Sequence, residues 1–151
     1  MKKFQNINEI LEFAITSEQE AVDFYTNLAS HSRNDHMKKV FIDFAQEEMK
    51  HKVRLTSIKD SNSFKMPDEK VRDLKIADYL VDVKPTPDMT YADALVLAMK
   101  KEKNAFRLYL LLSEETDDPS MKAVFISLAQ EESKHKLKFE LEYDEYILKE
   151  N

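Results

Sequence analysis

The chain of 151 residues contains no glycine. Average usage would place about ten glycines in a chain of this length. Tight hairpin turns, phosphate-binding loops and dinucleotide-binding turns all depend on glycine, because their backbones adopt positive φ angles or approach a ligand closely. The composition therefore argues against a sheet protein, a P-loop protein and a dinucleotide-binding fold.

Cysteine is absent as well, which excludes disulfides, thiolate metal sites and a cysteine nucleophile. The net charge of −6 disfavours nucleic acid as a partner, because phosphate binding needs a basic face. No apolar run approaches the roughly 18 residues of a membrane span, and the start, MKKFQNINEILEF, lacks the apolar core and cleavage site of a signal peptide. We therefore expect a cytoplasmic protein that binds neither nucleic acid nor membranes.

The sequence repeats itself once. The stretch AQEEMKH at 45–51 returns as AQEESKH at 129–135, an offset of 84 residues, and VFIDF and VFISL extend the match without a gap. Two copies of one helical hairpin predict an all-α fold, a four-helix bundle in a single domain over 1–151, with repeat halves at about 6–58 and 90–142.

Apolar residues that recur at alternating steps of three and four predict the helices of this bundle. Asn6 and Thr90 each precede an acidic residue by three positions, the spacing of a capping box, and Asp118 precedes a proline at a helix start. These signals predict four helices, at about 7–30, 36–59, 91–114 and 119–149.

The connections between the predicted helices differ in length. Short loops within each pair make both hairpins antiparallel, whereas the segment between the second and third helices has about 30 residues. That length can cross the bundle, as in bundles with one long crossover connection. Within it, PDEKVRDL is expected to add a helical turn or two, and VKPTPD to end it.

The inward stripes of the four predicted helices carry polar residues at their middle. The first and third helices contribute one glutamate each, and the second and fourth contribute Glu-x-x-His, whose spacing puts both side chains on one face. This combination is the ligand set of di-metal carboxylate bundles, and its oxygen and nitrogen donors suit iron, manganese or zinc. The candidate ligands are Glu18, Glu48, His51, Glu102, Glu132 and His135.

A lone Glu-x-x-His is more often a solvated pair than a metal site, but here the motif occurs in both halves and on the apolar stripe. Four buried carboxylates are costly unless their charge is neutralised, and two divalent ions would balance them with both histidines neutral. Glu47 and Glu131 lie one position off the stripe and are expected to face solvent. Tyr25 and Tyr109, seven residues after a glutamate, are either core tyrosines or hydrogen-bond donors to a ligand carboxylate.

With these residues identified, the chain resembles the rubrerythrin branch of the ferritin-like superfamily. The matching phrases are EQEAVDFY and EKNAFRLY on the first and third helices, and EEMKH and EESKH on the second and fourth. The resemblance covers about 7–149 and implies a ferritin-like bundle that binds two iron ions. Carried over by position, it implies that Glu48 and Glu132 bridge the two metals and that Glu18 and Glu102 are terminal ligands. His51 and His135 would each bind one metal.

Two departures from the family pattern affect the expected activity. Full-length rubrerythrins end in a rubredoxin-like domain with four cysteines, whereas this sequence has none, so the electron donor is expected to be a separate protein. Typical members also carry a further glutamate ligand one turn after the glutamate of the third helix. The matching position here is Ala105.

The resemblance favours a di-iron oxidoreductase that reduces hydrogen peroxide or O₂, with the six ligands catalytic through the metals. A first alternative is a ferroxidase or iron-handling protein, for which Fe²⁺ is the substrate. A second is a non-catalytic, metal-stabilised bundle that acts as a binding or sensor module. A homodimer is expected from the family and from the long connecting segment.

Overall fold

The computed structural model describes residues 4–32, 34–74, 76, 85–86 and 89–150. These residues form five α-helices and no strand, which confirms the predicted all-α fold. Each long helix begins and ends within one residue of its predicted bounds, and no helix of the described part is long and apolar enough to cross a membrane. The helices are α1 (Ile7–His31), α2 (Asp35–Asp60), α3 (Asp68–Asp73), α4 (Tyr91–Glu115) and α5 (Pro119–Glu150).

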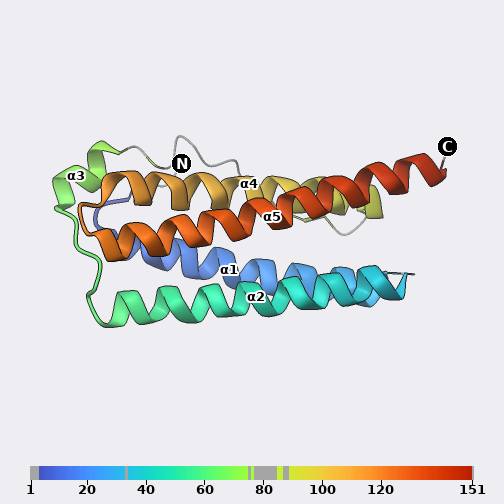
Figure 1. Cartoon of the computed structure of the whole chain (residues 1–151), viewed down its shortest axis with the longest axis horizontal. Coiled ribbons are helices and arrows are strands. Elements are labelled where there is room, and N and C mark those ends of the chain that lie inside the picture. Colours follow the sequence, from blue (N-terminus) through green and yellow to red (C-terminus); the bar gives the residue numbers. More distant parts are fainter. Residues whose placement is uncertain (1–3, 33, 75, 77–84, 87–88, 151) are drawn as a thin grey trace. The chain divides into compact units, whose positions relative to one another are not determined.

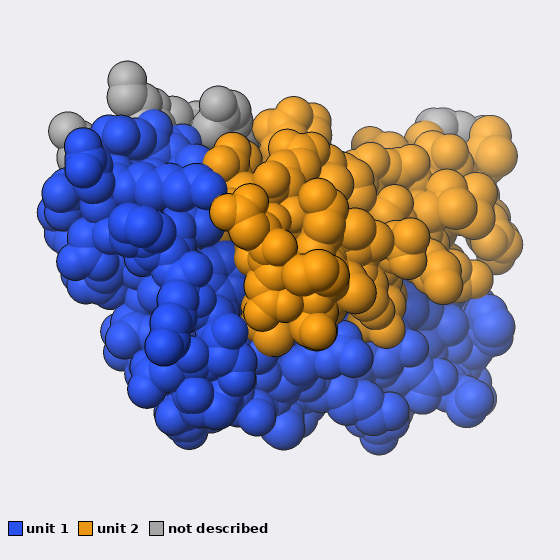
Figure 2. All heavy atoms as spheres, turned by 60° about the vertical axis from the view of Figure 1, so that its left-hand side comes forward, with its two compact units in different colours: residues 1–75 blue, residues 76–151 orange. Residues whose placement is uncertain are grey.

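The chain divides into two compact units, residues 1–75 and 76–151 (Figure 2). In the first unit α1 and α2 lie side by side as an antiparallel hairpin, followed by the short α3 (Figure 1). In the second unit α4 and α5 form the corresponding hairpin. Each unit therefore contains one copy of the repeat found in the sequence, while the arrangement of the two copies as a single domain stays a prediction.

The predicted capping box at the start of α4 is complete. The Thr90 hydroxyl accepts a hydrogen bond from the Asp93 N–H at 3.1 Å, and the Asp93 carboxylate accepts one from the Thr90 N–H at 3.3 Å. At the start of α1 only half of the box forms. Asn6 accepts from the Glu9 N–H at 3.0 Å, but the Glu9 carboxylate accepts from Gln5, one residue earlier than the box requires.

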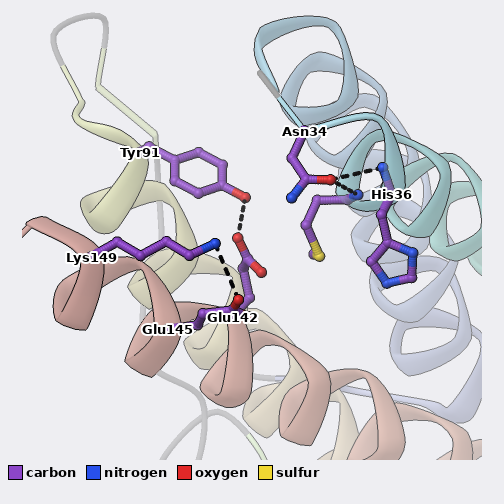
Figure 3. Close-up of polar contacts among 7 residues, drawn as sticks. Asn34, His36, Tyr91, Glu142, Glu145 and Lys149 are labelled. Atoms are coloured by element: carbon purple, nitrogen blue, oxygen red, sulfur yellow. Dashed lines mark hydrogen bonds and ion pairs between the residues drawn. The ribbon is translucent and has the colours of Figure 1, made fainter.

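The two remaining hairpin helices are capped by residues in the short loops that precede them. Asn34 Oδ1 accepts from the N–H groups of His36 and Met37, at 2.8 and 3.3 Å (Figure 3). Asp118 Oδ1 accepts from the Ser120 N–H at 2.9 Å. Both caps satisfy amides that a helix leaves without intrahelical partners in its first turn.

The end of α2 shows how this chain closes a helix without glycine. Asn62 adopts a positive φ of 54°, the left-handed conformation that glycine usually supplies and asparagine tolerates. The Asn62 N–H bonds to the Lys59 carbonyl at 3.2 Å, and the Ser63 N–H bonds to the Ile58 carbonyl at 3.1 Å. These are the two hydrogen bonds of a Schellman motif, so α2 stops at a defined residue.

Part of the connecting segment buries its apolar residues. Phe64, Met66 and Val71 are buried, and the helical turn predicted in PDEKVRDL is α3. The stop predicted at VKPTPD falls on residues 83–88, of which only 85–86 lie within the described part.

The inward stripes are buried with four exceptions. Phe44, Tyr91, Ala105 and Met121 are only half-buried, and the small neighbour Ala45 is buried beside Phe44. The buried stripe residues are Ile7, Leu11, Ala14, Glu18, Ala21, Tyr25 and Leu28 on α1, Phe41, Glu48, His51, Leu55 and Ile58 on α2, Leu95, Ala98, Glu102, Tyr109 and Leu112 on α4, and Phe125, Leu128, Glu132, His135 and Phe139 on α5.

The repeat is broken near the start of α4. In the first unit two buried isoleucines, Ile7 and Ile58, occupy the positions that Tyr91 and Glu142 hold in the second. The Tyr91 hydroxyl donates to Glu142 Oε1 at 3.2 Å (Figure 3). The Tyr91 ring meets Tyr146 edge-on with centroids 5.0 Å apart. Burial, helped by the Glu142 charge, raises the pKa of the Tyr91 phenol, and burial also raises the pKa of the Glu142 carboxyl.

This pair gives a stability prediction with a definite sign. A carboxyl whose pKa is raised on folding stabilises the fold below its unfolded pKa of about 4.3 and loses that contribution as pH rises. Glu142→Gln cannot ionise and still accepts from Tyr91, so it should raise the free energy of unfolding at pH 7 by about 0.5 kcal/mol. Denaturant titration should show this gain shrinking toward zero near pH 4.

Tyr91→Phe is the matched variant, because it removes the donor and leaves the carboxylate. It should lower the free energy of unfolding at pH 7 by about 1 kcal/mol. If Glu142→Gln is instead destabilising at pH 7, and this loss shrinks toward pH 4, the ionised carboxylate stabilises this end of the hairpin and the interpretation is wrong.

Candidate metal centre

In the first unit the three predicted ligands come from both helices of the hairpin. Glu18 lies on α1 between Ala14 and Ala21, whose small side chains leave room beside the carboxylate. Glu48 and His51 lie one turn apart on α2, on the face that α1 covers. All three side chains are buried, with 2%, 1% and 3% of their surface exposed, respectively.

The distances within this triad suit a shared ion better than direct hydrogen bonds. His51 Nδ1 lies 3.7 Å from Glu18 Oε2 and 3.9 Å from Glu48 Oε1. Both separations exceed hydrogen-bond length. Nitrogen and oxygen ligands bind a divalent ion such as Zn²⁺ at about 2.0–2.2 Å, so two of them can lie up to about 4 Å apart on one metal. The three donors are therefore already spaced as ligands of one ion.

The second unit repeats the arrangement with Glu102 on α4 and Glu132 and His135 on α5. Their exposed fractions are 1%, 1% and 2%. His135 Nδ1 lies 3.7 Å from Glu102 Oε2, the same nitrogen at the same distance as in the first unit. In each triad one ligand atom from every residue lies within 4.8 Å of the others. The duplicated motif thus has duplicated geometry.

The donor set of each triad fits a divalent metal. Two carboxylates and one neutral imidazole carry two negative charges, which one M²⁺ balances. Oxygen and imidazole donors suit iron, manganese or zinc, whereas copper(I) prefers sulfur.

The two tyrosines predicted near the ligands are core residues by position. Tyr25 and Tyr109 are 0% and 1% exposed, and the Tyr109 ring stacks on Phe125 with centroids 6.3 Å apart. The hydrogen bond from each tyrosine to a ligand carboxylate stays a prediction.

The neighbouring residues behave largely as their register indicates. Glu47 is exposed, and Glu131 is half-buried. Ala21, one turn after Glu18, is buried, and Ala105, at the equivalent position of α4, is half-buried. Among the described residues, the clusters able to hold a metal contain none outside the six predicted ligands, so the sequence reasoning missed none of them.

The comparisons with known proteins agree with this description. The family model described as Rubrerythrin matches residues 9–143, which include all six candidate ligands. Neither the curated proteins nor the solved structures gave a significant match. The family match confirms the resemblance seen in the sequence, and the all-α fold agrees with the ferritin-like class. The chain belongs to the rubrerythrin family.

Proposed function

We propose that this protein is a di-iron oxidoreductase that reduces hydrogen peroxide or O₂ with electrons from a separate donor protein. The observation that carries the proposal is the duplicated Glu–Glu–His triad, buried and spaced for one divalent ion in each unit. Membership of the rubrerythrin family supports iron as the metal.

In this proposal each triad would hold one metal of a di-iron pair. The family pattern would make Glu48 and Glu132 bridging ligands, Glu18 and Glu102 terminal ligands, and each histidine a ligand of one metal. When bound, each iron would supply one electron, so the pair would supply the two electrons that reduce hydrogen peroxide to water or O₂ to peroxide. The protein would contribute fixed ligands, neutral imidazoles and charge balance.

The residues around each triad would keep bulk water from the ligands. On α2 the side chains before and after the motif, Phe41 and Leu55, are fully buried, and on α5 Leu128 and Phe139 play the same part. A low-dielectric surrounding strengthens the attraction between carboxylates and metal. It also means that a donor protein would deliver electrons through the protein rather than by contact with the metals. We propose further that the working protein is a homodimer.

Ala105 favours a second candidate, a ferroxidase for which Fe²⁺ is the substrate. The family's additional glutamate would stand here, and alanine offers no carboxylate that could take over an iron from its histidine on oxidation. Both irons would then keep their histidines in both redox states. The alanine therefore supports slow oxidation of Fe²⁺ by O₂ as the function over rapid reduction of peroxide.

Metal content gives the first test. Protein loaded anaerobically with Fe²⁺ should contain two irons per chain. Mass spectrometry of the metal measures this content. Glu48→Ala should lose about two irons, because a bridging carboxylate serves both, and Glu18→Ala should weaken mainly one. Glu47→Ala is the matched control and should keep both, because Glu47 is exposed. Unchanged iron in Glu48→Ala would refute the bridging assignment.

Reaction stoichiometry separates the candidate functions. When the anaerobic two-iron protein is mixed rapidly with limiting peroxide, two Fe²⁺ should be oxidised per peroxide. The appearance of Fe³⁺ absorbance measures this oxidation. With excess Fe²⁺ and O₂, a ferroxidase should continue beyond the first two irons, whereas a donor-dependent reductase should stop. A two-iron protein that reacts with neither oxidant would leave the non-catalytic binding or sensor module as the function.

The empty ligand position can be tested by filling it. Ala105→Glu should accelerate peroxide reduction by about tenfold if a carboxylate at this position supports the reaction, and should shift the Mössbauer parameters of one iron. The equivalent substitution on α1, Ala21→Glu, is the comparison. No change in either rate or spectrum for Ala105→Glu would show that position 105 does not line the metal site.

A further inference from the structure

The outer sides of α2 and α5 carry the same row of residues in both copies of the repeat. Successive members of the row are four residues apart, so they lie next to one another along the helix surface. Lys138 is half-buried, and all other members are exposed. We call each row the basic ridge of its unit: Lys38, Ile42, Gln46, Lys50 and Arg54 on α2, and Lys122, Ile126, Gln130, Lys134 and Lys138 on α5.

The stability of the helices does not explain why both copies keep the ridge. Exposed positions beside it have changed: Lys39, Asp43 and Met49 correspond to Ala123, Ser127 and Ser133. Substitutions at exposed positions usually change the free energy of unfolding by less than about 0.5 kcal/mol. Lys50 and Arg54 are moreover like charges four residues apart, as are their equivalents on α5, and this spacing destabilises a helix slightly. The repeated cations therefore indicate binding rather than folding.

The ridges present positive charge on a chain whose net charge is −6. Each ridge has three basic side chains and no acidic one. The neighbouring acids are engaged elsewhere, because Asp43 pairs with Lys39 at 3.8 Å and the glutamate after each ridge glutamine has a partner outside the ridges. On α5 the ridge ends at Lys138, since the next position is Glu142, whose charge this lysine partly offsets. The charge of both ridges is complementary to an acidic partner.

Each ridge lies on the helical turns that carry the candidate metal ligands. Gln46 and Lys50 stand two residues before and after Glu48, and Lys50 is bonded directly to His51. The ligands themselves are no more than 3% exposed. A partner on the ridge would be separated from them by roughly the width of one helix, about 10 Å. The ridge is therefore a place from which an electron could reach the buried ligands along a short covalent path.

We propose that the two basic ridges are docking surfaces for an acidic one-electron carrier protein, the donor of the proposed function on which this inference rests. Each encounter transfers one electron, so the carrier is oxidised and one Fe³⁺ returns to Fe²⁺. The α2 ridge extends over about 24 Å of helix, which exceeds the size of a small anion and suits the small interfaces of transient electron-transfer complexes.

Apolar side chains complete the α2 docking surface. Ile42 on the ridge forms a short apolar stripe with Met49 and Val53 beside it, and the three are 40%, 38% and 63% exposed. On α5 the corresponding stripe contains Ile126 and Leu137, which are 37% and 56% exposed. In the complex the carrier covers these side chains, while the ridge cations attract and orient its acidic face.

Zero-length cross-linking tests where the carrier binds. The probe is a rubredoxin, a small acidic protein that carries one electron, mixed at low salt with the iron-loaded full chain. A carbodiimide joins lysine amines to carboxylates in contact with them, and peptide mass spectrometry should place the links at Lys38, Lys50, Lys122 and Lys134. Lys100 and Lys103 on α4 are the control, because both are exposed and Lys103 also adjoins a ligand. They should be linked about tenfold less often.

Charge reversal tests whether the contact serves electron transfer. Lys50→Glu combined with Lys134→Glu should slow reduction of the ferric protein by the reduced probe about tenfold at low salt, because attraction becomes repulsion. Lys50→Glu alone should roughly halve the rate, since the other ridge still works. At about 0.5 M salt the double variant should return to within about twofold of the parent. Lys100→Glu combined with Lys103→Glu makes the same change in net charge and should stay within about twofold throughout. Stopped-flow absorbance measures these rates.

Oxidation by limiting peroxide without a donor separates this proposal from the proposed function. The double ridge variant should oxidise its two Fe²⁺ as fast as the parent does. If neither protein reacts, the proposed function fails, and the cross-links still decide the docking site. An absence of links to the probe, links only between copies of the chain, links that fall equally on the α4 lysines, or a reduction rate that double reversal leaves unchanged would each overturn the proposal.

Discussion

The constraint on which this structure depends is the placement of four glutamates on the inner faces of its helices. Glu18, Glu48, Glu102 and Glu132 are each no more than 2% exposed. Isolated carboxylates at such depth would cost several kcal/mol each. A divalent ion in each triad would remove that cost, and because it would bind the folded chain, its affinity would add to the free energy of unfolding. The buried carboxylates that destabilise the metal-free fold are the same groups that would bind a metal.

The internal repeat explains why this placement is precise. His51 and His135 each direct Nδ1 toward a glutamate of the neighbouring helix at 3.7 Å, although they lie in different units. The triad is therefore a property of the hairpin itself: a glutamate on one helix, and Glu-x-x-His on the next. Small alanines beside Glu18, and large apolar residues one layer away on α2, complete the environment in which those side chains hold their positions.

The two halves differ at positions away from the six candidate ligands. Two buried isoleucines of the first unit are replaced by the hydrogen-bonded pair Tyr91 and Glu142. The short apolar stripe of α2 is extended on α5 by Leu141 and Leu148. Both changes involve the C-terminal part of α5, and the first also involves the start of α4. They alter the end of the hairpin and its outer surface, while the six candidate ligands keep their geometry.

The sequence by itself determined the helix bounds, the inward stripes and the six candidate ligands. Those features follow from local periodicity, because residues three and four apart share a helix face whatever packs against it. Periodicity does not say how completely a face is covered. Only the tertiary structure decided that Phe44 is half-buried while Ala45 is buried, that the Glu9 carboxylate reaches Gln5 instead of completing a capping box, and that Asn62 closes α2 in place of glycine. It also decided that Leu137 stays exposed, because exposure depends on which neighbouring helices cover a given side of α5 and not on the spacing of residues along it.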